Sequence, residues 1–392
     1  MKIVLFSDYY YPTIKSGSIV IKDLANELTR LGHEAIVITF NENQNDFLTK
    51  EKNGSITIIR LRSKLRKFGM IGRLLSELRY SSSIIKGLKI IDTDNIDGMI
   101  CFSPSIFYHK AIIWLKNEYR IKAYLIVRDI FPKWLLDAGI LKEGLLFRFF
   151  RKEEIKLYKS VDFIGIESIK DLDYFKNYLD ANTHLEVLDN WGSSLDIDKI
   201  ASHDSSPLPK GLINIIYGGN MADAQDLYSL LDDLDDSALE GKAFLTLIGS
   251  GHQLSNIKSL IKKRKFRNVR LLEEVDQKSY LSILKDADIG LVSLNKKLKS
   301  NNFPLKMMGY IQQSKPILAS VNPDNEIIEI IEKNDIGKVS ISGDKKKFNK
   351  NLISMIQNKE RLKKQGANAF ELFERRFTVK IAVEKILYKL IE

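Results

Sequence analysis

The chain has 392 residues, of which 44% are hydrophobic and 28% are charged, and it contains eight prolines and one cysteine. This length exceeds what one ordinary hydrophobic core holds, and the hydrophobic fraction excludes a disordered chain, so we expect two compact domains. The single cysteine, Cys101, excludes an internal disulfide, and the sequence lacks the Cys/His spacing of a structural zinc site. A formal net charge of +11 favours an anionic partner.

The first forty residues predict a strand, a helix and a second strand. Residues Met1–Ser7 form a short apolar run typical of a buried strand, and Thr13–Ser18 is a loop that contains glycine. An amphipathic helical pattern follows until Gly32, and Ala35–Thr39 begins the next strand. In open α/β sheets the turn after the first strand lies at the carboxyl edge, where ligands bind.

A basic segment, Arg60–Tyr80, comes next and interleaves cations with apolar residues such as Phe68 and Ile71. This composition is typical of a segment that lies on an anionic bilayer surface. The alternative is an amphipathic helix packed on the sheet with a solvated outer face. A second such stretch is Leu145–Lys152. Because the arginines have no aromatic platform for stacking bases, we expect no nucleic-acid partner.

Strand patterns alternate with helical patterns along both halves of the chain. The expected strands of the first half are Ile56–Ile59, Gly98–Phe102, Ala123–Val127 and Phe163–Ile166. After a loop-like stretch that ends at Gly211, the alternation restarts with Ile213–Tyr217, Phe244–Ile248, Val269–Leu272, Ile289–Val292 and Pro316–Ala319. This alternation predicts an α/β protein with two parallel sheets. The expected bounds are a first domain at 1–195, a linker at 196–211, a second domain at 212–375 and a final helix at 376–392.

Short motifs along nearly the whole chain resemble those of the retaining glycosyltransferases of family 4. They are Tyr11-Pro12, Ser16-Gly17, Leu31-Gly-His-Glu34, the glycine turns at 216–225 and 247–251, and the block at 301–316. The resemblance implies the GT-B fold, in which two Rossmann-like domains face a central cleft. It also implies that the first domain binds the acceptor, that the second binds a nucleotide-sugar, and that the final helix packs back on the first domain.

The same resemblance identifies candidate site residues. The acceptor-binding candidates are Pro12, Ser16 and Gly17. The donor-binding candidates are Gly218, Gly219, Asn220, Gly249, Gly251, Asn301, Phe303, Pro304, Leu305 and Lys306. This chain departs from the family pattern at several of its charged positions. Asn301 and Gly309 stand where the family has two glutamates, Asn220 and Gln225 replace its arginine and lysine, and Arg128-Asp129 replaces a His-Asp pair.

Arg128, Asp129 and Lys306 are the predicted catalytic residues. A nucleoside diphosphate gathers negative charge as it leaves, so a fixed cation stabilises the transition state most. With the usual clamp missing, Lys306 is the first candidate for this cation, assisted by the turn amides of Gly218 and Gly219. Arg128 is a candidate for the donor diphosphate or for an acceptor phosphate. The alternatives are a solvated lysine at a helix start and, for Arg128-Asp129, a structural ion pair.

The motifs R-D-x-F-P, G-N-x-x-x-A-Q, N-W and P-x-K resemble the branch of the family that builds O-antigen and capsule, including N-acetylfucosaminyltransferases. This resemblance implies transfer of an N-acetylated sugar from a UDP-sugar to a polyprenyl-diphosphate-linked saccharide, without a metal or other cofactor. We expect a cytoplasmic protein at the inner face of the cell membrane. Two alternatives remain: a nucleotide-sugar 2-epimerase, and a non-catalytic GT-B scaffold of a polysaccharide assembly complex, which the missing glutamates favour.

Overall fold

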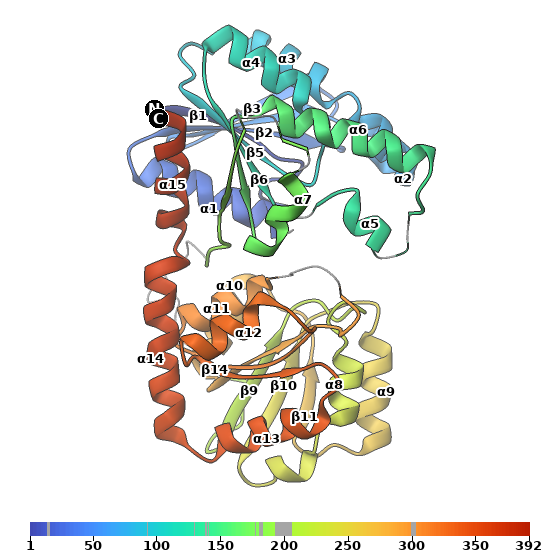
Figure 1. Cartoon of the computed structure of the whole chain (residues 1–392), viewed down its shortest axis with the longest axis vertical. Helices are drawn as coiled ribbons and strands as arrows, with labels where there is room; N and C mark the ends of the chain where they lie inside the picture. Colours follow the sequence, from blue (N-terminus) through green and yellow to red (C-terminus); the bar gives the residue numbers. More distant parts are fainter. Residues whose placement is uncertain are drawn as a thin grey trace. The chain divides into compact units, whose positions relative to one another are not determined.

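The computed structural model divides the chain into two compact units (Figure 1). Unit 1 comprises Met1–Asp189 and Val379–Glu392, and unit 2 comprises Asn190–Thr378. The structure describes residues 1–13, 16–91, 93–128, 130–137, 139, 141–176, 178–179, 183–192, 206–298 and 303–392.

The boundary after Asp189 falls earlier in the chain than the expected one at 195. The backbone N–H of Gly192 donates to the carbonyl of Phe377 at 3.0 Å, and this bond ties the segment after Asp189 to unit 2. Most of the expected linker, residues 196–205, lies outside the described residues.

Unit 1 is built on an eight-stranded sheet of order β3-β4-β2-β1-β5-β6-β7-β8. Its strands are β1 (Lys2–Phe6), β2 (Glu34–Asn41), β3 (Leu48–Asn53), β4 (Ile56–Arg62), β5 (Gly98–Phe102), β6 (Ala123–Val127), β7 (Phe163–Ile166) and β8 (His184–Val187). Strand β3 pairs antiparallel with β4 at the edge, and all other pairs are parallel. The sequence does not predict β3 because its four last residues are exposed, so no apolar run marks it.

Helices cover this sheet on both faces. They are α1 (Ser16–Arg30), η1 (Lys64–Phe68), α2 (Gly69–Glu77), α3 (Tyr80–Ile91), α4 (His109–Tyr119), α5 (Lys133–Asp137), α6 (Leu145–Ser160), η2 (Ile169–Asp171), α7 (Leu172–Lys176) and α15 (Val379–Ile391). The carboxyl-terminal α15 packs against α1 in unit 1 (Figure 1), and Lys385 pairs with Glu186 at 3.6 Å. None of the helices in the described ranges is both long and apolar enough to span a bilayer.

Unit 2 is built on a six-stranded parallel sheet of order β11-β10-β9-β12-β13-β14. Its strands are β9 (Ile213–Gly218), β10 (Ala243–Ile248), β11 (Val269–Leu272), β12 (Ile289–Ser293), β13 (Ile317–Val321) and β14 (Gly337–Ile341). Its helices are α8 (Leu227–Asp233), η4 (Asp236–Leu239), α9 (Leu254–Arg264), α10 (Gln277–Lys285), α11 (Leu305–Gln312), α12 (Glu326–Lys333), α13 (Lys345–Ile356) and α14 (Lys359–Arg376). The prediction of an α/β protein with two parallel, Rossmann-like sheets is therefore confirmed.

Candidate donor site

Lys306 lies in the first turn of α11, at the carboxyl edge of the sheet of unit 2. The side chain of the N-cap residue, Pro304, makes no capping hydrogen bond. The ammonium nitrogen of Lys306 is enclosed and has no hydrogen-bond partner within the described part of the chain. It sits 3.6 Å from the ring centroid of Tyr217, and a Cβ built on Gly219 would lie 3.8 Å from it. The ammonium group thus lies against the face of an aromatic ring and beside the backbone of a glycine.

Burial lowers the pKa of Lys306 from its usual 10.5 to about 7. The cause is desolvation, and among the described residues no carboxylate stabilises the charged form. An enclosed cation without a counterion is destabilising unless a ligand supplies the negative charge. This environment, together with the positive end of the α11 dipole, favours an anion at Nζ.

Two glycine turns, one after β9 and one after β10, pack on each other beside Lys306. A Cβ on Gly249 would lie 1.9 Å from the carbonyl oxygen of Gly219, and one on Gly251 would lie 2.4 Å from that of Met221. A Cβ on Gly218 would meet the ring of Tyr280 at 2.2 Å. Glycine is required at these positions because backbone and ring atoms occupy the space of any side chain.

The amides of these turns have partners within the protein. The N–H of Gly218 donates to the hydroxyl of Tyr310 at 3.3 Å, and the N–H of Gly219 donates to the carbonyl of Ile248 at 2.9 Å. This finding corrects the prediction that both amides assist in binding the diphosphate. The helix expected directly after the turn begins only at Leu227, where Asp226 caps α8. The helix that places its N-terminus at Lys306 is therefore α11 and not α8.

The other donor candidates surround α11. Phe303 is buried against Phe377, with ring centroids 5.6 Å apart, and its carbonyl accepts from Nδ2 of Asn190 at 3.4 Å. Leu305 is partly buried, and Asn220 is exposed beside Gly251. Asn301 lies outside the described residues. The sequence gives no sign of the contact between Asn190 and Phe303, which are 113 positions apart.

Gly309 differs from the turn glycines. A Cβ built there meets only the side chain of Leu284, at 3.8 Å, which is an ordinary van der Waals contact. Its backbone is helical, inside α11. A side chain at position 309 therefore fits, and neither packing nor backbone conformation demands the glycine that replaces the family's second glutamate.

Arg128 belongs to unit 1 and is held by backbone atoms. Its guanidinium donates to the carbonyls of Leu188 at 2.6 Å and Asp189 at 3.1 Å, and its own N–H donates to Oγ of Ser103 at 3.1 Å. These bonds fix the chain that leaves β8 against the end of β6. The geometry gives Arg128 a structural role, and its catalytic role stays a prediction. Asp129 lies outside the described residues.

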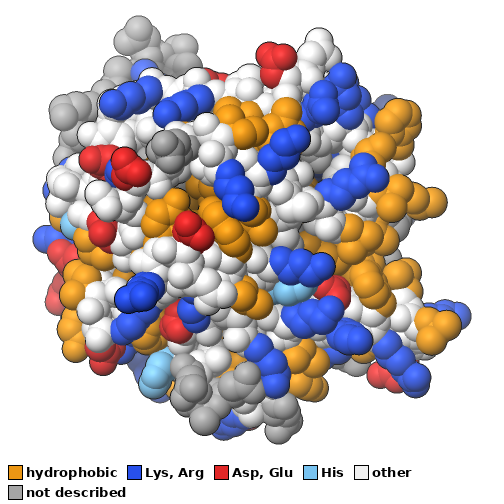
Figure 2. Space-filling view, turned by 90° about the horizontal axis from the view of Figure 1, so that it is seen from above, with side chains coloured by type: hydrophobic (Ala, Val, Ile, Leu, Met, Phe, Trp, Pro, Cys, Tyr) orange, Lys and Arg blue, Asp and Glu red, His pale blue; other side chains and the backbone are white. Residues whose placement is uncertain are grey.

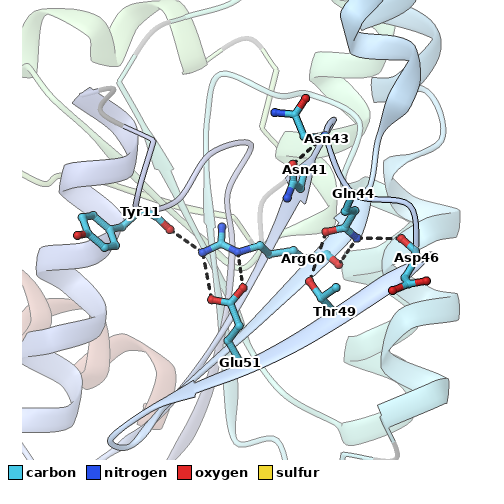
Figure 3. A network of polar contacts seen from close by, with 8 residues as sticks. All are labelled: Tyr11, Asn41, Asn43, Gln44, Asp46, Thr49, Glu51 and Arg60. Carbon is cyan, nitrogen blue, oxygen red and sulfur yellow. Dashed lines mark hydrogen bonds and ion pairs between the residues drawn. The ribbon is translucent and has the colours of Figure 1, made fainter.

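The acceptor candidates follow β1. Pro12 is exposed, and the preceding carbonyl, of Tyr11, accepts from Nη2 of Arg60 at 2.6 Å. Arg60 also pairs with Glu51 of β3 at 3.0 Å, so the edge strand braces this loop (Figure 3). Gly17 lies in α1, where a Cβ would be 3.0 Å from the ring of Phe102. Ser16 is the first residue of α1.

A buried polar cluster beneath this loop is not predicted by the sequence motifs. Asp8 accepts a hydrogen bond from the Tyr108 hydroxyl at 2.7 Å, and Nη1 of Arg66 donates to the Asp8 carbonyl at 3.1 Å. Arg73 pairs with Glu77 at 2.6 Å. Burial, and then the nearby charge of Asp8, raise the pKa of Glu77 to about 7. The one sequence signal is an aspartate directly after a buried strand.

This cluster changes the interpretation of the basic segment Arg60–Tyr80. Arg60, Arg66 and Arg73 contact groups of this unit and not an external surface. Four apolar residues of the segment are exposed, and so are the cations Arg62, Lys64, Lys67 and Arg79. Phe68, Ile71, Leu75 and Leu78 have 73%, 76%, 45% and 46% of their surface accessible.

Comparison with known proteins bears on the half of the chain that holds Lys306. Residues 198–372 match the family model described as Glycosyl transferases group 1. The match covers slightly less than half of the chain. A probable glycosyltransferase of Pseudomonas aeruginosa, WbjE, is 25% identical over 269 residues, which cover 67% of this chain and 64% of that protein.

Two solved structures share the fold over almost the full length of both chains. WaaG, a glycosyltransferase involved in lipopolysaccharide biosynthesis, matches with a TM-score of 0.69 at 12% identity, and covers 99% of each chain. HepE of Anabaena, solved with UDP and glucose, matches with a TM-score of 0.66 at 14% identity and covers 100% of this chain and 99% of its own. The chain therefore has the GT-B fold of these glycosyltransferases.

Proposed function

We propose that this protein is a retaining glycosyltransferase that moves an N-acetylated sugar from a UDP-sugar to a polyprenyl-diphosphate-linked saccharide in the synthesis of a bacterial surface polysaccharide. The observation that carries the proposal is the enclosed, unpartnered ammonium group of Lys306 at the start of α11. It lies within the part of the chain that matches the Glycosyl transferases group 1 model.

Lys306 has the properties that a leaving diphosphate needs. Negative charge grows on the oxygen of the β-phosphate as the glycosidic bond breaks, and a preorganised cation in a dry environment stabilises this charge strongly. The Lys306 ammonium is already desolvated and positioned on Tyr217, so little reorganisation is needed during the reaction. A lysine and a helix terminus in these roles make a metal ion unnecessary, and we propose a metal-independent reaction.

The donor class rests on two supports. The sequence motifs resemble a branch that uses N-acetylated UDP-sugars, and HepE, which shares the fold, was solved with UDP. Retention of configuration follows from the same resemblance, with the departing phosphate as the base. The catalytic assignments of Arg128 and Asp129, and acceptor binding at Pro12, Ser16 and Gly17, are part of this proposal.

A lipid-linked acceptor requires contact with a membrane, and unit 1 carries a surface suited to it. Phe68, Ile71, Leu75 and Leu78 are spaced at three and four positions, so they share one face of the η1–α2 segment. Leu145 and Leu146 at the start of α6 are exposed as well. Figure 2 shows hydrophobic and Lys or Arg side chains beside one another along the right-hand edge, the side on which Figure 1 draws α2 and α6. We therefore propose peripheral binding at the cytoplasmic face of the membrane.

The direct test is donor-dependent transfer with purified protein. Membranes that contain polyprenyl-diphosphate-linked saccharide are incubated with a panel of UDP- and GDP-sugars, with and without EDTA, and released nucleotide is measured. The proposal predicts acceptor-dependent UDP release that EDTA does not reduce and that Lys306→Met abolishes. Lys315→Met is the matched control, because this lysine is also partly buried with a lowered pKa but donates to the carbonyl of Lys285.

Two outcomes would contradict the proposal. Conversion of a UDP-N-acetylsugar to its 2-epimer without acceptor would identify an epimerase. Tight UDP binding without turnover across the whole panel would identify a non-catalytic scaffold, in which Asn301 and Gly309 mark lost chemistry.

A further inference from the structure

Unit 1 contains a cavity that is separate from the candidate acceptor loop. Its volume is about 340 Å³, which lies in the range of small-molecule sites. Its walls come from the carboxyl ends of β2 and β4, from η1, and from the α2–α3 junction. The carboxyl edge of a parallel sheet is the usual position of a ligand site.

The charged residues that line this cavity are all cations. Arg62, Lys64 and Arg79 line it, and no aspartate or glutamate is among the lining residues. Nη1 of Arg62 donates to the carbonyl of Asn45 at 2.7 Å, and Nζ of Lys64 donates to Oδ1 of the same residue at 3.0 Å. Asn45 thus binds two cations at the cavity, and neither cation forms an ion pair with a carboxylate in the described ranges of the chain. The cavity therefore favours an anion.

Two serines that line the cavity carry hydroxyl groups without partners. Ser63 is 7% exposed and Ser76 is 5% exposed, and the Oγ atom of each has no hydrogen-bond partner within the part of the chain that is described. A buried hydroxyl that lacks a partner is destabilising, and such groups are rare in native proteins. Oxygen atoms of a bound anion satisfy donors of this kind.

The surroundings of the cavity indicate the kind of molecule to which the anionic group belongs. Ser76 lies on α2 between the exposed Leu75 and Leu78, and Arg79 follows directly. A phosphate in the cavity would therefore have an exposed apolar surface beside it. Charge and apolar surface together fit an amphiphile better than a soluble ion.

We propose that this cavity binds the phosphate group of a lipid headgroup, at a site distinct from the donor site of unit 2. It supplies a specific anchor for unit 1 on a membrane, with the apolar residues of α2 in contact with the bilayer. The inference rests on the proposed peripheral membrane binding of unit 1, and it does not depend on sugar transfer.

The test uses full-length protein and vesicles of phosphatidylcholine alone or with phosphatidic acid, and measures binding by co-sedimentation. The expected result is at least tenfold tighter binding to the vesicles with phosphatidic acid, and loss of this difference in the double variant Arg79→Gln, Ser76→Ala. Lys52→Gln, which removes an exposed cation of β3 outside the cavity and outside the proposed membrane surface, is expected to change binding less than twofold. Equal losses in both variants would mean non-specific attraction and would overturn the proposal.

A second measurement keeps the proposal independent of folding and of the donor site. The double variant is expected to bind UDP like the parent protein and to unfold at no lower temperature, because Ser76→Ala removes an unsatisfied hydroxyl.

Soluble pyrophosphate is titrated in parallel. The lipid source predicts that pyrophosphate binds at least tenfold more weakly than the vesicles, and that Ile71→Ser with Leu75→Ser weakens only vesicle binding. Equal affinity for pyrophosphate and vesicles would contradict a lipid headgroup.

Discussion

Lys306 and Arg128 are both cations predicted to act on phosphate, and their surroundings differ in a way that sequence does not reveal. Arg128 donates to two backbone carbonyls of unit 1, so part of its hydrogen-bonding capacity already holds the fold together. Lys306 has an aromatic ring beside it and no hydrogen-bond partner among the described residues. A cation that donates to backbone carbonyls stabilises the fold, whereas an enclosed cation without a hydrogen-bond partner destabilises it and is best explained by a ligand.

The largest effect is expected from Lys306→Met. Because a hydrogen bond to a charged group contributes about 1.5–3 kcal/mol, we predict that UDP affinity falls by roughly ten- to more than a hundredfold. The same substitution removes a desolvated charge, so the free protein is expected to unfold at a higher temperature. Calorimetric titration with UDP and thermal unfolding check both parts. Lower stability together with unchanged UDP affinity would contradict this account, because it would give Lys306 the structural role assigned to Arg128.

Arg128→Gln is expected to show the opposite pattern. Loss of the charged hydrogen bonds to Leu188 and Asp189 should lower the free energy of unfolding by about 1.5–3 kcal/mol. UDP affinity should stay within twofold of the parent value, since Lys306 is untouched. Denaturant unfolding and the same calorimetric titration measure the two quantities. A tenfold loss of UDP affinity at full stability would show that Arg128 acts on the donor.

The smallest effect on stability and UDP affinity is expected from Gly309→Ala. This variant tests whether Gly309, unlike the glycines of the turns, tolerates a side chain. Its Cβ fits, and alanine favours a helix over glycine by about 0.8–1 kcal/mol, so we predict a small gain in stability with unchanged UDP affinity. Gly249→Ala is the contrasting variant and should destabilise unit 2, because its Cβ would lie 1.9 Å from the Gly219 carbonyl oxygen. Thermal unfolding of both variants tests the contrast.

The sequence predicts the fold well because buried parallel strands read as uninterrupted apolar runs, as in Ala123–Val127 and Ile213–Tyr217. It misses β3, whose exposed charged residues resemble a loop. It also identifies Lys306 as a candidate by motif. What it does not reveal depends on long-range contacts: the partners of the Gly218 and Gly219 amides, and the contact of Arg66 with Asp8.

The most direct test of the account is the pH dependence of UDP binding. With a pKa of about 7 in the free protein, Lys306 loses its proton above neutrality, whereas bound diphosphate holds the proton on and raises this pKa. The phosphates of UDP stay ionised between pH 7 and pH 9, since the second ionisation of a phosphate group has a pKa of about 6. UDP affinity should therefore fall on the order of 50-fold between pH 7 and pH 9, in proportion to the protonated fraction of Lys306. In Lys306→Met this slope should vanish. A parent affinity that does not change with pH, or a slope that persists in the variant, would contradict the role of Lys306 as the diphosphate cation.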